Sequence, residues 1–224
     1  MKNKALLILF ITLAFGFTRQ NQLPEGFVYA KDVIPDLDVE LRYYSTNNFV
    51  GDTINGYQAN KLIITKPTAN ALKKVQAELQ EHNLCLKVFD GYRPQRAVNH
   101  FILWARDLND TLNKQQFYPN IAKRHLFRDG YIASRSGHSR GSTLDLTIID
   151  GNTQEPLDMG SPFDFFGKQS WVNYQELTEQ QMYNRQLLQT VMLKHGFRNY
   201  PKEWWHFTLR NEPFPDTYFD FVVK

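Results

Sequence analysis

The chain has 224 residues, of which 42% are hydrophobic and 14% aromatic, so it can bury the core of a single domain. Its 26 Lys and Arg and 23 Asp and Glu give a formal net charge of +3, and the two signs are interspersed. Without a basic block, we expect binding neither to nucleic acid nor to a membrane surface. The single cysteine, Cys85, excludes an intramolecular disulfide and a cysteine-based zinc site, and we expect it to be buried.

A short basic start over residues 1–4 precedes an apolar run over 5–17. The run has the length of a secretory signal and is too short for a comfortable membrane span. We therefore predict a signal peptide over 1–18 and one domain over 19–224. This predicts an exported, periplasmic protein without stable membrane association once the signal is removed, and a retained membrane anchor is the alternative.

Residues 38–89 are predicted to form two strands, a loop and a helix. Polar and apolar residues alternate over 38–43, which predicts a half-buried strand. The glycine-containing stretch 47–58 is predicted as a loop that lies over a site. Pro67 opens a helix that ends near Asn83, and the apolar residues 84–89 form the following strand.

A strand-to-helix corner follows this strand. Gly91 permits the turn, and Pro94 fits the first position of the next helix. Arg93 is therefore held at the corner. Small and apolar residues at helical spacing form the core face of this helix: Ala97, Phe101, Ala105 and Leu108.

Later in the chain, residues 144–149 are predicted as a strand and 150–167 as a loop. Thr178 with Gln181 forms a capping box for a helix that Gly196 stops. Residues 203–209 enter a last strand. The order contains no regular βαβ units, so we predict an α+β fold with a mainly antiparallel sheet and flanking helices.

Two of the six histidines each neighbour a carboxylate and a predicted strand. His138 lies in a stretch of Ser and Gly seven residues before Asp145, and such a loop bends tightly enough to bring both side chains to one point. His206 follows Glu203 by three residues, a spacing that lets one side chain bind metal while the other reaches its open side. Two imidazoles, a carboxylate and a spare carboxylate suit a catalytic zinc site. His82 and His195 are expected at helix ends or on the surface, His100 on a helix and His125 in a polar loop, and none of the four is expected to bind metal.

In such a site zinc lowers the pKa of its water toward neutrality. Glu203 would take the proton of this water and deliver it to the leaving amine. Charge then builds on the carbonyl oxygen, to which Arg93 could donate hydrogen bonds from its corner. An ion pair between Arg93 and Asp90, or another carboxylate, is an equally good interpretation.

Four motifs stand in order along the chain: DGYRP at 90–94, SGHSRGS at 136–142 with Asp145, GSPFDF at 160–165 and EWWH at 203–206. Together they resemble those of the zinc D-alanyl-D-alanine dipeptidases, a family that includes the enzyme of vancomycin resistance and its periplasmic relatives. The resemblance runs from Asp38 to Lys224. It implies the α+β zinc D,D-peptidase fold shared with D,D-carboxypeptidases, endolysin-type peptidases and the hedgehog signalling domain.

The resemblance also implies one Zn²⁺ per chain and a role for each site residue. The zinc ligands that it implies are His138, Asp145 and His206. Glu203 is the implied catalytic base, and Arg93 is the implied stabiliser of the tetrahedral intermediate. Asp164 is expected to receive the substrate's ammonium group, because a carboxylate recognises a free amine, and Ser136 to line the pocket.

The implied activity is hydrolysis of free D-Ala-D-Ala to two D-alanines. Resistance enzymes of the family act in the cytoplasm, whereas the predicted signal favours cell-wall turnover or salvage of D-alanine outside it. The alternatives are a carboxypeptidase or endopeptidase that acts on peptidoglycan stems, and a zinc module that binds the cell wall without turnover. The sequence leaves the oligomeric state open.

Overall fold

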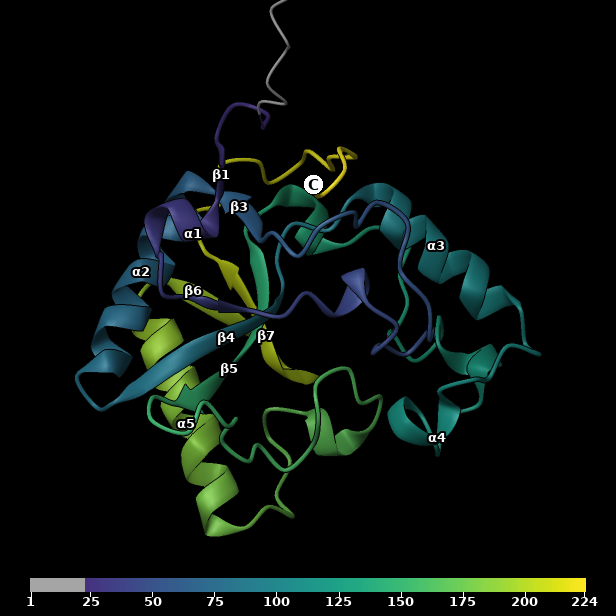
Figure 1. Ribbon diagram of the computed structural model, residues 1–224. Coiled ribbons are helices and arrows are strands. Elements are labelled where there is room, and N and C mark those ends of the chain that lie inside the picture. The colour runs from purple at the N-terminus through teal and green to yellow at the C-terminus, as the bar shows by residue number, and fades with distance from the viewer. Residues whose placement is uncertain (1–22) are drawn as a thin grey trace, which may run out of the picture.

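A five-stranded sheet forms the centre of the fold in the computed structural model, which describes residues 23–224 (Figure 1). The signal peptide predicted over 1–18 lies outside these residues. The strand order is β2-β4-β5-β7-β6, and only the β2–β4 pair is parallel. The predicted α+β fold with a mainly antiparallel sheet is confirmed. In sheet order, the strands are β2 (Asp38–Val39), β4 (Leu84–Asp90), β5 (Thr143–Asp150), β7 (Glu203–Leu209) and β6 (Phe197–Tyr200).

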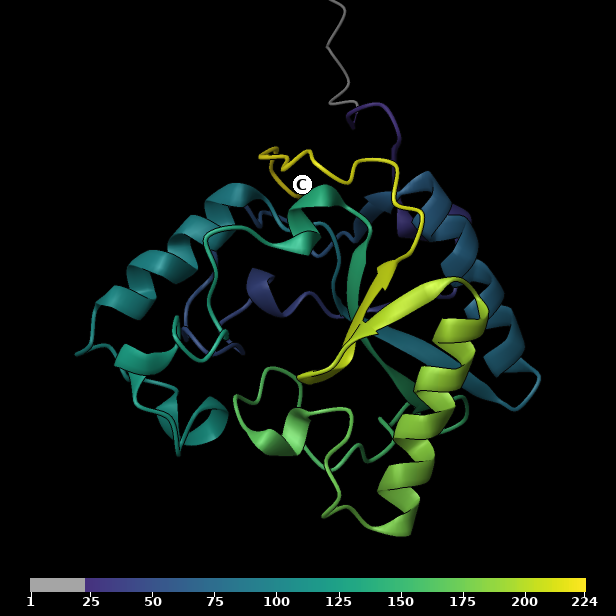
Figure 2. The same ribbon diagram turned by 180° about the vertical axis from the view of Figure 1, so that it is seen from behind.

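Helices lie on both sides of this sheet. The helices α2 (Lys66–Gln80) and α5 (Glu179–Lys194) run along one side, and α3 (Gln95–Arg106) lies on the other, as Figures 1 and 2 both show. Among the described residues, no helix is both long and apolar enough to cross a bilayer. The remaining short elements are β1 (Phe27–Tyr29), β3 (Ile63–Thr65), α1 (Ala30–Val33) and α4 (Lys114–Phe117).

The register of the three middle strands places polar side chains in one row. β5 lies between β4 and β7, and all its residues except Asp150 are buried. Asp145 on β5 pairs with Asp90 on β4 and with His206 on β7. Because strands of a sheet lie about 4.8 Å apart, paired residues on neighbouring strands are close enough to share one site. The sheet thus gathers a carboxylate, a second carboxylate and an imidazole from distant parts of the sequence.

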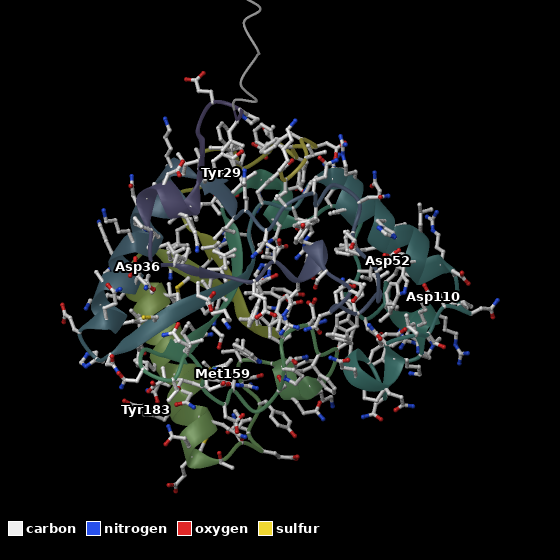
Figure 3. The ribbon with its side chains drawn as sticks, in the orientation of Figure 1. Tyr29, Asp36, Asp52, Asp110, Met159 and Tyr183 are labelled. Atoms are coloured by element: carbon white, nitrogen blue, oxygen red, sulfur yellow. The ribbon has the colours of Figure 1, made fainter. Side chains whose placement is uncertain are left out.

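The elements with strong local signals form as predicted. α5 begins with the complete Thr178–Gln181 capping box, and β7 occupies the predicted residues 203–209. The predicted loop 47–58 contains no regular helix or strand. Figures 1 and 3 together show that the chain crosses the molecule between Asp36 and Asp52, from the side of α2 to the side of α3.

The strand predicted over 38–43 is wrong beyond its first two residues. β2 ends at Val39, and the next residues turn into a short 3₁₀ helix over Arg42–Tyr44. The turn buries Tyr43 completely under the site, whereas an extended strand would continue along the sheet edge. Tertiary burial therefore overrides the local alternation.

Smaller corrections concern the ends of α3 and the cysteine. Pro94 is the residue before the helix rather than its first residue, and α3 ends before Leu108, which is 53% exposed. Cys85 is half-buried rather than buried. The short edge strand β6 had no sequence pattern that predicted it.

Candidate metal centre and active site

Three side chains offer metal ligands at one point: His138, Asp145 and His206. One ligand atom from each lies within 4.8 Å of the other two. His138 Nε2 is 3.3 Å from Asp145 Oδ2, and His206 Nδ1 is 3.2 Å from Asp145 Oδ1. The sequence-predicted ligand set is therefore brought together, with the carboxylate between the two imidazoles.

A tight turn aims His138 at this point. Ser136 precedes the 3₁₀ helix Gly137–Arg140, and its Oγ accepts a hydrogen bond from the His138 amide at 3.3 Å. The turn ends at Gly141, whose φ of 79° lies in the left-handed region. A side chain there would also collide with the Phe27 ring, so glycine is required on both grounds. β5 begins two residues later at Thr143 and carries Asp145 into the sheet.

The donor set fits a zinc ion. Asp145 Oδ1 is buried and accepts no hydrogen bond within residues 23–224. His138 Nδ1 donates to the Gly91 carbonyl at 2.8 Å, which leaves Nε2 free to bind metal. Two imidazoles and one carboxylate are the ligand types of catalytic zinc sites, which keep one position open. Their arrangement thus has the donors, the unpaired atom and the tautomer that zinc requires.

The ionisation of the ligands shows that the site favours a cation. Burial raises the pKa of Asp145, but the adjacent His138 and His206 outweigh burial and hold its pKa below the usual range. Burial lowers the pKa of His206, but its close contacts with the Asp145 and Glu203 carboxylates outweigh burial and raise it to about 9. A buried carboxylate that stays ionised attracts either a proton or a metal ion to the neighbouring imidazole.

Glu203 lies beside the ligands at the start of β7. Its Oε2 is 3.2 Å from His206 Nδ1, and 25% of its side chain is exposed. The carboxylate therefore remains accessible to a water molecule in the cavity. Glu203, the residue predicted as the base, thus lies next to the predicted ligand set.

Arg93 makes the predicted ion pair and also faces the site. Its Nε lies 2.8 Å from Asp90 Oδ2, and its Nη2 lies 3.2 Å from Asp145 Oδ2. The guanidinium carbon is 4.8 Å from the centroid of the Tyr43 ring. Ion pairs and ring contact hold the guanidinium rigidly, while the side chain still lines the cavity. The two interpretations of Arg93 are therefore compatible.

A cavity of about 280 Å³ is lined by the three predicted metal ligands together with Arg93, Glu203, Ser136 and Asp164. Asp164 is buried, and its Oδ2 accepts a hydrogen bond from the Tyr43 hydroxyl at 2.8 Å. Burial and then the charge of Asp145 raise the pKa of Asp164 well above its ordinary value. A larger cavity of about 740 Å³ lies beyond Tyr131 and Phe166 and contains none of these site residues.

The loop that carries Asp164 is anchored to the sheet by aromatic rings. Phe163 stacks on Phe89 of β4 at 4.8 Å between centroids and meets Trp205 of β7 edge-on at 5.5 Å. Asp164 itself has a φ of 60°. A positive φ is uncommon for a residue with a side chain and is found where surrounding contacts impose it. The rings therefore fix the carboxylate in the cavity.

A family model described as D-ala-D-ala dipeptidase, of peptidase family M15, matches residues 24–224. The chain therefore belongs to this family. The D-alanyl-D-alanine dipeptidase of Enterococcus faecalis is 39% identical over 202 residues, which cover 90% of this chain and 100% of that protein. Those of Enterococcus faecium and Streptomyces coelicolor are each 38% identical, covering 89% and 88% of this chain and 98% of each relative. This M15 chain is a metallopeptidase with a zinc site, as the sequence resemblance implied.

Sequence reasoning offered the Arg93–Asp90 ion pair but missed the two tyrosines, Tyr57 and Tyr43, that donate hydrogen bonds to buried carboxylates of this M15 site. Asp90 is completely buried and accepts hydrogen bonds from Tyr57 at 2.6 Å and from Arg93 at 2.8 Å. Tyr43 supports Asp164 in the same way. Neither tyrosine stands in one of the four motifs, and Tyr43 was assigned to a strand.

The other four histidines lie apart from the metal centre. His100 Nδ1 accepts a hydrogen bond from the Asn55 amide, and His195 pairs with Glu78 at 2.7 Å. His125 contacts the neighbouring Arg124, and His82 is exposed. His82 follows the end of α2, His195 ends α5 and His100 lies on α3, as expected for them.

Proposed function

We propose that this chain hydrolyses free D-Ala-D-Ala to two D-alanines with one zinc ion per chain. The observation that carries the proposal is the buried Asp164 carboxylate, which shares a cavity with the metal ligands and Glu203. A carboxylate in that position selects a substrate whose amine is free. At about 280 Å³ the cavity suits a small ligand rather than a long peptide.

Zinc bound by His138, Asp145 and His206 would lower the pKa of a water molecule toward neutrality and polarise a carbonyl group. Glu203 takes the proton from the attacking water, because its carboxylate is accessible and only 3.2 Å from a ligand nitrogen. The same carboxyl then delivers the proton to the leaving amine.

Arg93 stabilises the negative charge that develops on the scissile carbonyl oxygen. Its ion pair with Asp90 holds the guanidinium before substrate arrives, so little reorganisation is needed during the reaction. Asp164 pairs with the substrate ammonium group and thereby places the peptide bond between Glu203 and Arg93. Ser136 lines the same cavity, and its Oγ also holds the turn that carries His138.

The export of the protein and its role in cell-wall turnover or D-alanine salvage are part of the proposal. The apolar run over 5–17 supports export. Fractionation of cells that produce the full chain tests this, with a variant lacking residues 1–18 as the control. Equal distribution of both forms between cytoplasm and periplasm would contradict it.

The activity is tested by incubating the zinc-loaded protein with D-Ala-D-Ala, L-Ala-L-Ala and N-acetyl-D-Ala-D-Ala, each with and without a chelator. We expect rapid cleavage of the free D,D-dipeptide alone, abolished by the chelator. Preferred cleavage of the acetylated compound would indicate a carboxypeptidase or endopeptidase instead. Metal binding without cleavage of any of the three would indicate a non-catalytic zinc module.

A further inference from the structure

The segment Phe219–Val223, here called the clasp, joins the two parts of the chain that carry Arg93 and His138. The Phe219 amide donates to the Ser139 carbonyl at 2.9 Å, and the Phe219 carbonyl accepts from the Gln95 amide at 3.0 Å. Ser139 directly follows His138, and Gln95 is two residues beyond Arg93. The backbone of one residue therefore bridges the turn of a metal ligand and the corner of the arginine.

The clasp also caps α3, which cannot cap itself. The residue before the helix is Pro94, whose side chain offers no hydrogen-bond acceptor. Asp220 Oδ1 accepts from the Arg96 amide at 2.7 Å, across 124 residues of sequence, and from Arg96 Nε at 2.9 Å. A carboxylate at this end also complements the helix dipole. The cap therefore stabilises the helix start immediately after Arg93.

A third contact of the clasp is with the chain on either side of Tyr57, a residue that binds the buried Asp90. The Gln58 amide donates to the Val223 carbonyl, and the Val223 amide donates to the Gly56 carbonyl, both at 2.8 Å. Between these two residues stands Tyr57, whose hydroxyl donates to Asp90 at 2.6 Å. Asp90 in turn holds Arg93. The clasp is thus linked to Arg93 in two ways. One link runs through the backbone of Gln95, and the other runs through Tyr57 and the buried Asp90.

We propose that the clasp is a positioning element for catalysis, with Asp220 as its principal positioning residue. It holds Arg93 and His138 in a fixed relation by capping α3 and bridging Gln95 to Ser139. Fractions of an ångström matter at such a site, because a misplaced catalytic group loses much of its effect on the transition state. The proposal rests on the proposed dipeptidase activity for its kinetic readout.

Three substitutions separate the cap from its ion pair and from general stability. Asp220→Ala removes both the cap and the ion pair with Arg96. Arg96→Ala removes the same ion pair but keeps the backbone amide that Asp220 caps. Glu78→Ala is the matched control, because it removes another surface ion pair, to Lys194 and His195, that joins α2 to α5 far from the cavity.

We expect Asp220→Ala to lower kcat for D-Ala-D-Ala by roughly 10- to 100-fold with little change in KM or zinc content. Asp220→Asn keeps an acceptor oxygen and should recover most of the activity. Arg96→Ala and Glu78→Ala should stay within about threefold of the wild type, since surface ion pairs contribute little. All assays are run well below the unfolding midpoint of each variant.

Amide hydrogen exchange of the zinc-loaded protein gives a readout that needs no activity. Asp220→Ala should raise the exchange rates of the Gln95 and Arg96 amides at least about tenfold, while Glu78→Ala leaves them unchanged. The proposal would be overturned if Asp220→Ala had the same kcat and the same exchange rates as the wild type. It would also be overturned if Arg96→Ala lost as much activity as Asp220→Ala. If the wild type itself does not cleave the dipeptide, the activity assignment fails, and the exchange rates still decide whether the clasp holds the corner.

Discussion

The Tyr43 hydroxyl and the Asp164 carboxylate meet at 2.8 Å although 121 residues separate them in sequence. Tyr43 comes from a 3₁₀ turn at the sheet edge, and Asp164 comes from a loop anchored by aromatic rings. The bond orients a carboxylate that burial has stripped of water and whose pKa is consequently raised. Because a desolvated carboxylate gains most from a cationic partner, this pair favours a substrate with a free ammonium group.

Asp164→Asn is therefore expected to reduce selectivity for the free amine. The amide keeps the size of the carboxyl but cannot neutralise an ammonium ion. We expect kcat/KM for D-Ala-D-Ala to fall by about 100-fold or more, because binding that positions the peptide bond is lost. The ratio of kcat/KM for the free dipeptide to that for its N-acetyl derivative should fall by a similar factor. An unchanged ratio in this variant would show that Asp164 does not recognise the free ammonium group of the substrate.

The raised pKa of Asp164 also predicts a pH dependence of stability. Its carboxyl ionises near 3.8 in the unfolded chain and at higher pH in the folded protein. The folded state binds more protons between these two pKa values, so stability falls as pH rises through that window. The asparagine of Asp164→Asn does not titrate, so this variant does not lose that stability. Across the window its free energy of unfolding should rise relative to the wild type by about 1.4 kcal/mol for each unit by which the folded pKa exceeds the unfolded one. Urea unfolding of both metal-free proteins from pH about 3 to about 8 measures the difference; parallel curves would contradict the prediction.

Glu203→Gln should separate turnover from metal binding. The substitution keeps the shape of the side chain but removes the group that accepts the proton from water. Turnover should fall by about 10²- to 10⁴-fold while zinc content stays at one ion per chain. Glu155→Gln, which changes an exposed carboxylate elsewhere, serves as control. Retained turnover in Glu203→Gln would refute its assignment as the base.

Loss of either predicted histidine ligand should abolish zinc binding and the stabilisation of the fold by zinc. His138→Ala and His206→Ala are each expected to lose the metal, and added zinc should no longer raise the unfolding temperature. A ligand at 100 times its Kd contributes about 2.7 kcal/mol to the wild type by mass action. His82→Ala, at an exposed position, should keep the full response to zinc. Differential scanning calorimetry with and without zinc measures the effect, and a normal response in His138→Ala would exclude it as a ligand.

Arg93→Lys tests whether the planar guanidinium is required. Lysine keeps the charge but cannot reach Asp90, Asp145 and a carbonyl oxygen with a fixed fork of donors. We expect kcat to fall by about 100-fold with a smaller change in KM. Arg93→Ala should in addition destabilise the fold by roughly 3–5 kcal/mol, because it leaves the buried Asp90 without its cation. Equal stability of Arg93→Ala and wild type would mean that Asp90 is held by other groups.

Local sequence signals predicted those elements whose ends are marked by specific residues. The Thr178–Gln181 box starts α5 because its side chains satisfy the first amides of the helix themselves. The strand predicted over 38–43 stops after Val39, and β6 had no local signal, because both lie at sheet edges where distant contacts decide the conformation. Helix α3 could be predicted in its interior, but the cap at its start comes from Asp220 and leaves no trace near Pro94.

The sequence by itself predicted the chemistry of the centre: His138, Asp145 and His206 as metal donors, and Glu203 as the spare carboxylate. This prediction combined the residue types and spacings of the two histidine motifs with the resemblance of all four motifs to the zinc D-alanyl-D-alanine dipeptidases. Only the tertiary structure decided that Asp90, Asp145 and His206 share one row, that Tyr43 supports Asp164, and that the clasp holds the corner of Arg93. These relations depend on strand register and on contacts between residues more than a hundred positions apart, which local patterns do not encode.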